Sequence, residues 1–383
     1  MTSLNTQSTF VPGRLQQMAT RVAFFIAGFG IAAWAPLVPY AKARAGLDEG
    51  TLGLLLLCLG VGSILAMPLA GALSARFGCR RVMIGGTLLI CAALPLLATV
   101  SAVPALIAAL FMFGAGLGTV DSTVNLQAVI VERASGKTMM SGFHGLFSLG
   151  GIVGAAGVSG LLGLGLSPLA AMLVVVVLLI AALLKAAPHM LPYGSESSGP
   201  AFAVPHGIVL FIGGMCFIVF LAEGAALDWS AVFLVQERGI ATAYAGLGYA
   251  AFALTMTVGR LTGDAIVHRL GATRVIVCGG LLAAAGLFVA TFAPDWEVAL
   301  LGYAMLGAGC SNIVPVLYTA VGKQTVMPES IAVPAITTLG YAGILAGPAV
   351  IGFIAHGSSL SFAFGLMGVL LVAVAIGGRV LKV

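Results

Sequence analysis

The chain repeats its own glycines at an offset of 193 residues, with no gap between the two copies. The paired positions are Gly46 and Gly239, Gly53 and Gly246, Gly78 and Gly271, Gly86 and Gly279, Gly114 and Gly307, Gly116 and Gly309, Gly150 and Gly343, and Gly154 and Gly347. The sequence between them is otherwise generic and apolar. Glycine is costly inside a helix, so its recurrence in register indicates a duplicated helical unit.

The apolar character of both copies predicts an all-α membrane protein. Of the 383 residues, 60% are hydrophobic and only 8% are charged, whereas a soluble domain carries about 25% charged residues. Apolar runs of about 20 residues predict helices that span a bilayer. Twelve such runs occur, at 18–41, 50–75, 81–101, 103–132, 138–163, 166–187, 206–236, 242–267, 273–292, 296–321, 330–355 and 359–380.

The charges between these runs predict the topology. Twelve spans place both chain ends on one side, and most of the basic residues fall on that side: Arg14, Arg21, Arg76, Arg80, Arg81, Arg133, Lys137, Lys185, Arg269, Arg274, Lys323, Arg379 and Lys382. The opposite side holds only Lys42, Arg44 and Arg238. The positive-inside rule makes the first side cytoplasmic. We therefore expect a bacterial inner-membrane protein with both termini in the cytoplasm.

The long connection at 188–205 is rich in proline, glycine and serine, which is typical of a linker. It divides the chain into a six-helix bundle at 18–187 and a second at 206–380. Because six is even, both bundles have the same orientation, so they are parallel repeats related by a pseudo-twofold axis along the membrane normal. Such repeats place a binding site at the interface between them.

Several functional classes are disfavoured. The six cysteines show no CxxC pair and no zinc-ligand spacing, so we expect no metal. Gly136-Lys137-Thr138 resembles the end of a phosphate loop, but Val131 occupies the position of its first glycine. Basic residues are scattered singly, which argues against nucleic acid. We expect no enzyme activity and no cofactor, a monomer in the lipid bilayer, and an ion gradient as the source of energy.

The loop after the second run resembles the signature loop of the major facilitator superfamily (MFS). Its matching residues are Gly71, Arg76, Gly78, Arg80 and Arg81, and a weaker copy follows the eighth run at Gly263, Asp264, Arg269, Gly271 and Arg274. The resemblance covers essentially the whole chain and implies a transporter that works by alternating access. Ala75 stands where the family has an acid that helps to hold the halves together on the cytoplasmic side. That contact is therefore expected to be weaker, or to depend on Asp264.

Four further segments resemble the YbjJ-like branch of bacterial inner-membrane proteins, which is distantly similar to fucose permeases. They are Trp34-Ala35-Pro36, Asp121-Ser122-Thr123-Val124-Asn125, Phe143-His144 and the run from Glu223 to Ser230. The resemblance implies a carrier of a small solute. The fifth run is rich in glycine but lacks the proline of the antiporter motif, which disfavours drug–proton antiport.

Three carboxylates lie inside apolar runs: Asp121, Glu223 and Asp228. A charge in the bilayer centre costs about 2.5–3.5 kcal/mol, so it needs a partner, water or a proton. None of the three acids recurs in the repeat. We therefore predict Asp121 and Glu223 as proton-coupling residues, together with His144, since histidine titrates near neutrality. Asp121 could alternatively be held by Asn125, four residues away on the same helix face.

The predicted solute-binding residues are indoles, amides, tyrosines and one acid, because a polyol or sugar is held by ring stacking and hydrogen bonds. They are Trp34, Asn125, Asp228, Trp229, Asn312, Tyr318 and Tyr341, and Pro315 permits a bend beside Asn312. Each tryptophan could instead anchor its helix at the membrane interface. Arg260 is expected to pair with Asp264, four residues away, and to stabilise or gate. Glu132 is expected to pair with Arg133 or a basic loop.

The sequence thus predicts a proton-coupled symporter for a small, polar, neutral solute, with a sugar or polyol as the first guess. A proton-coupled exporter of amphipathic compounds is the alternative in the same class. A membrane sensor or scaffold that transports nothing is the alternative of another class, and the absence of an attached soluble domain disfavours it.

Overall fold

The computed structural model describes residues 12–47, 49–195, 204–240, 244 and 246–381, and its regular elements there are all helices. The first half comprises α1 (Arg14–Trp34), η1 (Ala35–Leu37), α2 (Val38–Ala45), α3 (Glu49–Phe77), α4 (Cys79–Thr99), α5 (Val103–Ser135), α6 (Met140–Gly163), α7 (Pro168–Ala186) and η2 (Ala187–His189). The second comprises α8 (Gly207–Arg238), α9 (Leu247–Leu270), α10 (Ala272–Phe292), α11 (Trp296–Cys310), α12 (Ile313–Val321), α13 (Glu329–Gly357) and α14 (Leu360–Val380).

These helices form twelve segments of membrane-spanning length, which confirms the predicted fold. The run from α1 to α2 forms one segment, and α11 with α12 forms another. Eleven segments of the described chain are long and apolar enough to cross a membrane. The twelfth, α9, carries Arg260 and Asp264 inside the helix, which makes it less apolar. The predicted and observed helix ends differ most at the start of α9, which is predicted at 242 and lies at Leu247.

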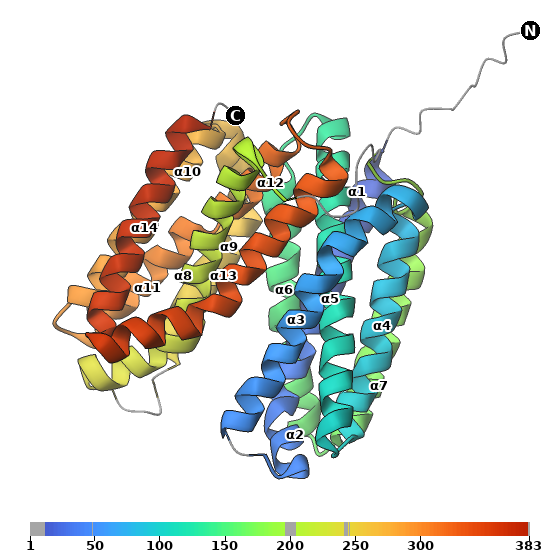
Figure 1. Ribbon diagram of the computed structural model, residues 1–383, viewed down its shortest axis with the longest axis horizontal. Helices are drawn as coiled ribbons and strands as arrows, with labels where there is room; N and C mark the ends of the chain where they lie inside the picture. The colour runs from blue at the N-terminus through green and yellow to red at the C-terminus, as the bar shows by residue number, and fades with distance from the viewer. Residues whose placement is uncertain (1–11, 48, 196–203, 241–243, 245, 382–383) are drawn as a thin grey trace, which may run out of the picture.

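The repeated glycines explain why the two halves fold alike. A Cβ added at Gly114 on α5 would meet the carbonyl of Leu59 on α3, and one at Gly307 on α11 would meet the carbonyl of Phe252 on α9. Leu59 and Phe252 are themselves separated by the repeat offset. The same close approach therefore recurs in each half, and only glycine permits it. Figure 1 shows α1–α7 on one side of the molecule and α8–α14 on the other.

The loops repeat as well as the helices. Gly78 and Gly271 have φ angles of +83° and +81°, a region that favours glycine. Arg44 donates to the carbonyl of Ala98, and Arg238 donates to the carbonyl of Thr291; the two acceptors are separated by the repeat offset, and the two arginines by one residue more. The predicted linker is described only at 188–195 and 204–205. The domain boundaries at 187 and 206 remain a prediction, and Lys382 lies outside the described residues.

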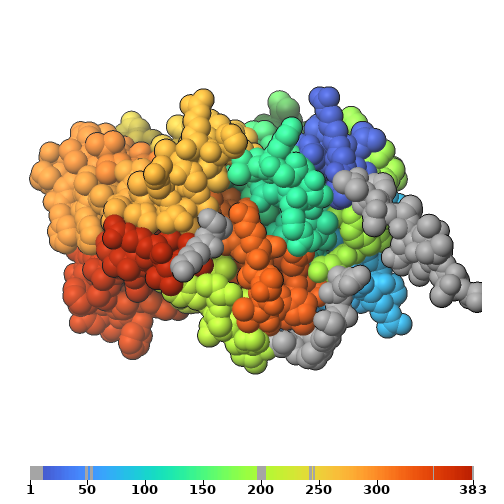
Figure 2. Space-filling view, turned by 90° about the horizontal axis from the view of Figure 1, so that it is seen from above, coloured from blue at the N-terminus to red at the C-terminus, as the bar shows by residue number. Residues whose placement is uncertain are grey.

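We call the end of the molecule at which α1 begins and α14 ends the terminal face (Figure 1). The positive charges predict that it faces the cytoplasm. The halves contact each other mainly through α3 with α13 and α6 with α9. The hydrogen bonds and ion pairs between the halves that are described below all lie between the terminal face and mid-helix. Figure 2 shows this face from above, where green and orange segments of the two halves touch.

Candidate functional site

Asp121 and Asn125 lie on one face of α5, as their spacing predicts. The Asn125 side-chain amide donates to the Asp121 backbone carbonyl at 2.9 Å and approaches its carboxylate at 3.4 Å. Its helix, α5, contacts α12 and α13 of the second half, which carry Tyr318 and Tyr341. The described residues form no ion pair with Asp121. The Asp121 carboxylate therefore lies on a helix of the interface, and no cation among the described residues compensates its charge.

His144, near the start of α6, lies between aromatic rings from both halves. Its ring centroid is 5.1 Å from that of Phe24 on α1 and 5.5 Å from that of Tyr318 on α12. The Tyr318 hydroxyl bonds the hydroxyl of Thr337 on α13 at 2.7 Å. His144 Nε2 is buried and has no hydrogen-bond partner in the described structure. The histidine thus offers one unused polar atom at the interface between the halves.

Arg260 and Glu223 form an ion pair inside the second half, and this corrects the expected pairing of Arg260 with Asp264. The Arg260 guanidinium lies 3.3 Å from the Glu223 carboxylate, and the two side chains are 7% and 14% exposed. Arg260 also donates to the Ser148 hydroxyl of α6 at 3.1 Å, which links it to the first half. The four-residue spacing along α9 favoured Asp264 as the partner of Arg260. The Arg260 side chain instead turns toward the membrane interior and pairs with Glu223 of α8, whose charge would otherwise be uncompensated.

The break between α11 and α12 provides a third partner for Arg260. Pro315 has no N–H, so it cannot bond the carbonyl of Ser311 four residues earlier. That free carbonyl accepts a hydrogen bond from Arg260 Nε at 3.4 Å. Asn312 at the break donates to the carbonyl of Gly259 and the hydroxyl of Ser311, each at 3.0 Å. The side-chain oxygen of Asn312, Oδ1, is buried without a partner among the described residues.

Asp264 joins the halves nearer the terminal face. Its carboxylate accepts from the backbone N–H of Gly142 at 3.1 Å, and its carbonyl accepts from the Thr138 hydroxyl at 3.1 Å. Both donors are at the start of α6, where free N–H groups attract a negative charge. Asp264 thus contacts the first half, as expected if it takes over the role of the acid that Ala75 lacks.

Glu132 and Arg133, at the end of α5, reach the second half separately. Glu132 accepts from the Thr319 hydroxyl and, at 2.7 Å each, from the N–H groups of Met139 and Met140. It therefore caps α6 rather than pairing with Arg133, which corrects that expectation. Arg133 forms an ion pair with Glu329 at the start of α13.

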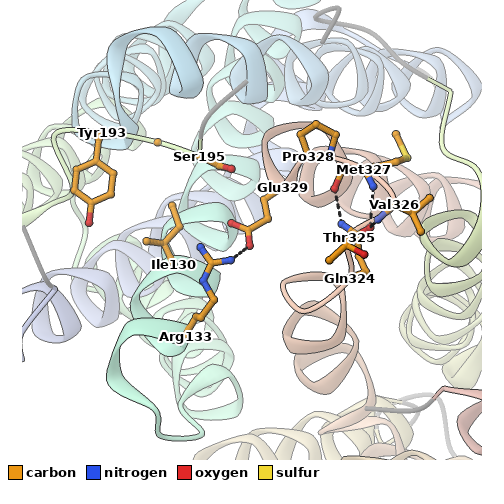
Figure 3. A pocket seen from close by; sticks show the side chains of 11 residues that line it. Ile130, Arg133, Tyr193, Ser195, Gln324, Thr325, Val326, Met327, Pro328 and Glu329 are labelled. Atoms are coloured by element: carbon orange, nitrogen blue, oxygen red, sulfur yellow. Dashed lines mark hydrogen bonds and ion pairs between the residues drawn. The ribbon is translucent and has the colours of Figure 1, made fainter. Parts of the chain in front are cut away.

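The Arg133–Glu329 pair lies beside a surface pocket of about 780 Å³ at the terminal face (Figure 3). The pocket is also lined by Tyr193 from the start of the linker and by the loop from Gln324 to Pro328. Glu329 supplies an acid to this interface from the second half. Ala75 supplies none from the signature loop, so the interface between the halves is held by carboxylates at other positions.

Two signature residues of the first loop, Gly78 and Arg80, hold the linker, whereas Gly71 lies against Ser330 and Pro334 of α13 in the second half. Arg80 donates to the carbonyls of Met190 and Pro188 at 3.1 and 2.6 Å. A Cβ added at Gly78 would meet the carbonyl of Pro192. The other signature bases, Arg76, Arg81 and Arg269, lie at helix ends on the terminal face.

The tryptophans and Asp228 are not brought together by any described contact. Trp34 is buried, and the Trp229 indole lies against Gly352 of α13. Neither indole N–H has a hydrogen-bond partner among the described residues. Asp228 is exposed. These three residues stay candidates for solute contact from the side opposite the terminal face.

Sequence reasoning missed Ser148, Ser311, Thr319 and Glu329. Ser148 is four residues after His144 on the same helix face, and Ser311 is four residues before Pro315. Those spacings were available signals. Thr319 and Glu329 gave no local signal, because their partners are more than 180 residues away in sequence.

Comparison with known proteins identifies the family. A family model described as the Major Facilitator Superfamily matches residues 22–221 and again 207–382. An uncharacterized MFS-type transporter of Yersinia pestis is 55% identical over 374 residues, which cover 97% of each chain. The membrane protein MosC of Rhizobium meliloti is 31% identical over 376 residues, covering 96% of this chain and 89% of that protein.

A solved structure shows the same fold. The fucose:proton symporter FucP of E. coli superimposes with a TM-score of 0.80 over 96% of this chain and 98% of that one. Its sequence identity is 16%, so the likeness concerns the fold alone. The YbjJ-like branch stays a prediction. The family model and the relatives each span both halves, and the chain belongs to the Major Facilitator Superfamily.

Proposed function

We propose that the chain is a proton-coupled symporter that moves a small polar solute across the inner membrane by alternating access. The solute and the proton bind between the halves, which then rock to open the site to the other side. The observation that carries the proposal is Asp121, an acid on an interface helix that forms no ion pair within the described part of the chain. An ionised carboxylate is costly there, so a proton compensates it when the loaded carrier reorients.

Glu223 has a different part in this scheme. In this structure its charge is compensated by Arg260, so here it gains less from a proton than Asp121 does. We therefore assign proton coupling first to Asp121, with His144 as the neighbouring polar group on α6. Asn125, Asn312, Tyr318 and Tyr341 are proposed to bind the solute, since they offer amides and hydroxyls at the interface between the halves.

Two alternatives remain distinguishable. An exporter of amphipathic compounds needs a mainly apolar cavity, and the polar groups contributed by α5, α6, α8, α9 and α12 favour a hydrophilic solute instead. A sensor or scaffold binds its ligand without moving it. The fucose:proton symporter has the same fold, which supports proton coupling here as a proposal only.

The test is proton movement in proteoliposomes that contain the purified chain and a pH-sensitive dye. Hexoses, alditols and aldonates are added one at a time. A symporter alkalinises the side from which its solute enters, and Asp121→Asn abolishes that signal. Solute uptake without proton movement, or with the same proton movement in Asp121→Asn, would refute the coupling. Solute binding without any uptake would favour the sensor.

A further inference from the structure

The Arg260 guanidinium is held loosely for a buried charge. Its three hydrogen bonds measure 3.1 Å to Ser148, 3.3 Å to Glu223 and 3.4 Å to the Ser311 carbonyl. Charge-assisted bonds of arginine to carboxylates are usually about 2.7–2.9 Å and often bidentate. A guanidinium has five N–H groups, so these bonds engage three of them. One N–H on each terminal nitrogen is left, which is the number that a second carboxylate can accept in a fork.

Polar atoms without a protein partner lie in the neighbourhood of this guanidinium. His144, whose Nε2 has no partner, is one helical turn from Ser148, and Ser148 accepts from Arg260. Asn312, whose side-chain Oδ1 has no partner, donates from its amide nitrogen to the Ser311 hydroxyl, and the Ser311 backbone carbonyl accepts from Arg260. All of these statements concern the described residues. Buried polar atoms of this kind gain from a ligand that carries several hydrogen-bonding groups.

We propose that Arg260 binds a carboxylate of the transported solute, and that Glu223 is the internal carboxylate that this group replaces. The solute class is then a small hydroxy acid, such as a sugar acid, rather than a neutral polyol. The inference rests on the proposed transport function and specifies its solute. Once released from Arg260, Glu223 accepts hydrogen bonds from the hydroxyls of the solute.

The loose geometry separates this role from a purely structural ion pair. A pair that only stabilises a fold is expected to be short, bidentate and fully buried, because the desolvation of both charges must be offset. Here Glu223 touches Arg260 through one oxygen, and its side chain keeps 14% of its exposure. Arg260 also contacts α6 of the other half through Ser148, so an anion bound to it would lie where the halves move against each other.

The first experiment uses matched pairs of solutes with the purified full chain in detergent. D-gluconate is compared with D-glucitol, and D-galactonate with galactitol, by thermal shift. We expect at least one aldonate to raise the melting temperature while its alditol leaves it unchanged, since ligands that bind the folded state stabilise it. Alditols that stabilise as well as aldonates, or no shift with any aldonate, would overturn the proposal.

The second experiment uses variants with the aldonate that gives the largest shift. Arg260→Gln should weaken its binding at least tenfold, and Glu223→Gln should tighten it, because the competing carboxylate is gone. The double variant Glu223→Gln/Arg260→Gln removes both charges together and controls for misfolding. Arg379→Gln, at an exposed arginine of α14, is the matched control and should bind normally. Undiminished binding by Arg260→Gln, or weaker binding by Glu223→Gln, would contradict the exchange.

The outcomes also separate this inference from the proposed function. Proton-coupled uptake of a neutral alditol would overturn the carboxylate solute and leave the symporter intact. Arg260-dependent binding of an aldonate without proton movement would support the carboxylate solute and overturn the proton-coupled symporter.

Discussion

Removing the charge of Arg260 alone should destabilise the protein more than removing both charges of its ion pair. At 3.3 Å and an effective dielectric constant of about 20, the attraction between Arg260 and Glu223 is about 5 kcal/mol. Desolvation of the two groups offsets part of it, and breaking a buried pair by removing one partner costs about 3–5 kcal/mol. The loose geometry places the loss of Arg260 at the lower end of that range, and the loss of Glu223, whose side chain is more exposed, just below it.

We therefore expect Arg260→Gln to lower the free energy of unfolding by about 3 kcal/mol and Glu223→Gln by about 2 kcal/mol. The double variant carries two neutral amides that can bond each other, so it should lose only about 2 kcal/mol. The coupling energy, which is the loss in the double variant minus the two single losses, is then about −3 kcal/mol, a value typical of residues in direct contact.

The assay is reversible unfolding in detergent micelles by titration with sodium dodecyl sulfate, followed by tryptophan fluorescence. Arg379→Gln is the control, and an exposed substitution of this kind should stay within about 0.5 kcal/mol of the parent. If the double variant lost about 5 kcal/mol, the sum of the single losses, the two side chains would be energetically independent. The ion pair would then explain neither the stability of this region nor the loss of unfolding free energy in Arg260→Gln.

Four further substitutions test the packing and the contacts at the terminal face. Gly114→Ala and Gly307→Ala should each destabilise the chain by about 1–3 kcal/mol, because a Cβ at either site meets a backbone carbonyl of the neighbouring helix. Gly85→Ala on α4 meets nothing within 4 Å and should be neutral or slightly stabilising in the same unfolding titration. Equal effects at all three sites would refute the packing argument. Glu329→Gln should weaken closure of the terminal face by about 0.2–1 kcal/mol, since its partner Arg133 is 58% exposed. Single-molecule distance measurements across that face should show an open population larger by a factor of about 1.4 to 5, and an unchanged population would contradict the assignment.

The fold could be predicted from the sequence because its signals are local or periodic. Run length fixes each span, and the glycines at the repeat offset mark where helices approach closely, as Gly114 and Gly307 do in the structure. The site could be predicted only in part. Asp121, Glu223 and His144 stood out because polar groups are costly in apolar runs.

Their partners could not be predicted, because partnership between helices depends on rotation and depth that no local pattern encodes. Arg260 has an acid four residues away, yet it bonds Glu223, which is 37 residues away. Glu132 has a base beside it, yet it caps α6 and bonds Thr319. In both cases the three-dimensional packing offered a partner from another helix in place of the neighbour on the same helix.

The most direct test of proton-coupled symport compares two modes of transport in Asp121→Asn. In proteoliposomes, exchange of labelled for unlabelled solute needs only the reorientation of the loaded carrier, whereas accumulation against a gradient needs the proton. The variant mimics a permanently protonated Asp121, so we predict that it keeps exchange and loses accumulation driven by a pH gradient. Accumulation by Asp121→Asn at the rate of the parent chain would contradict the central claim.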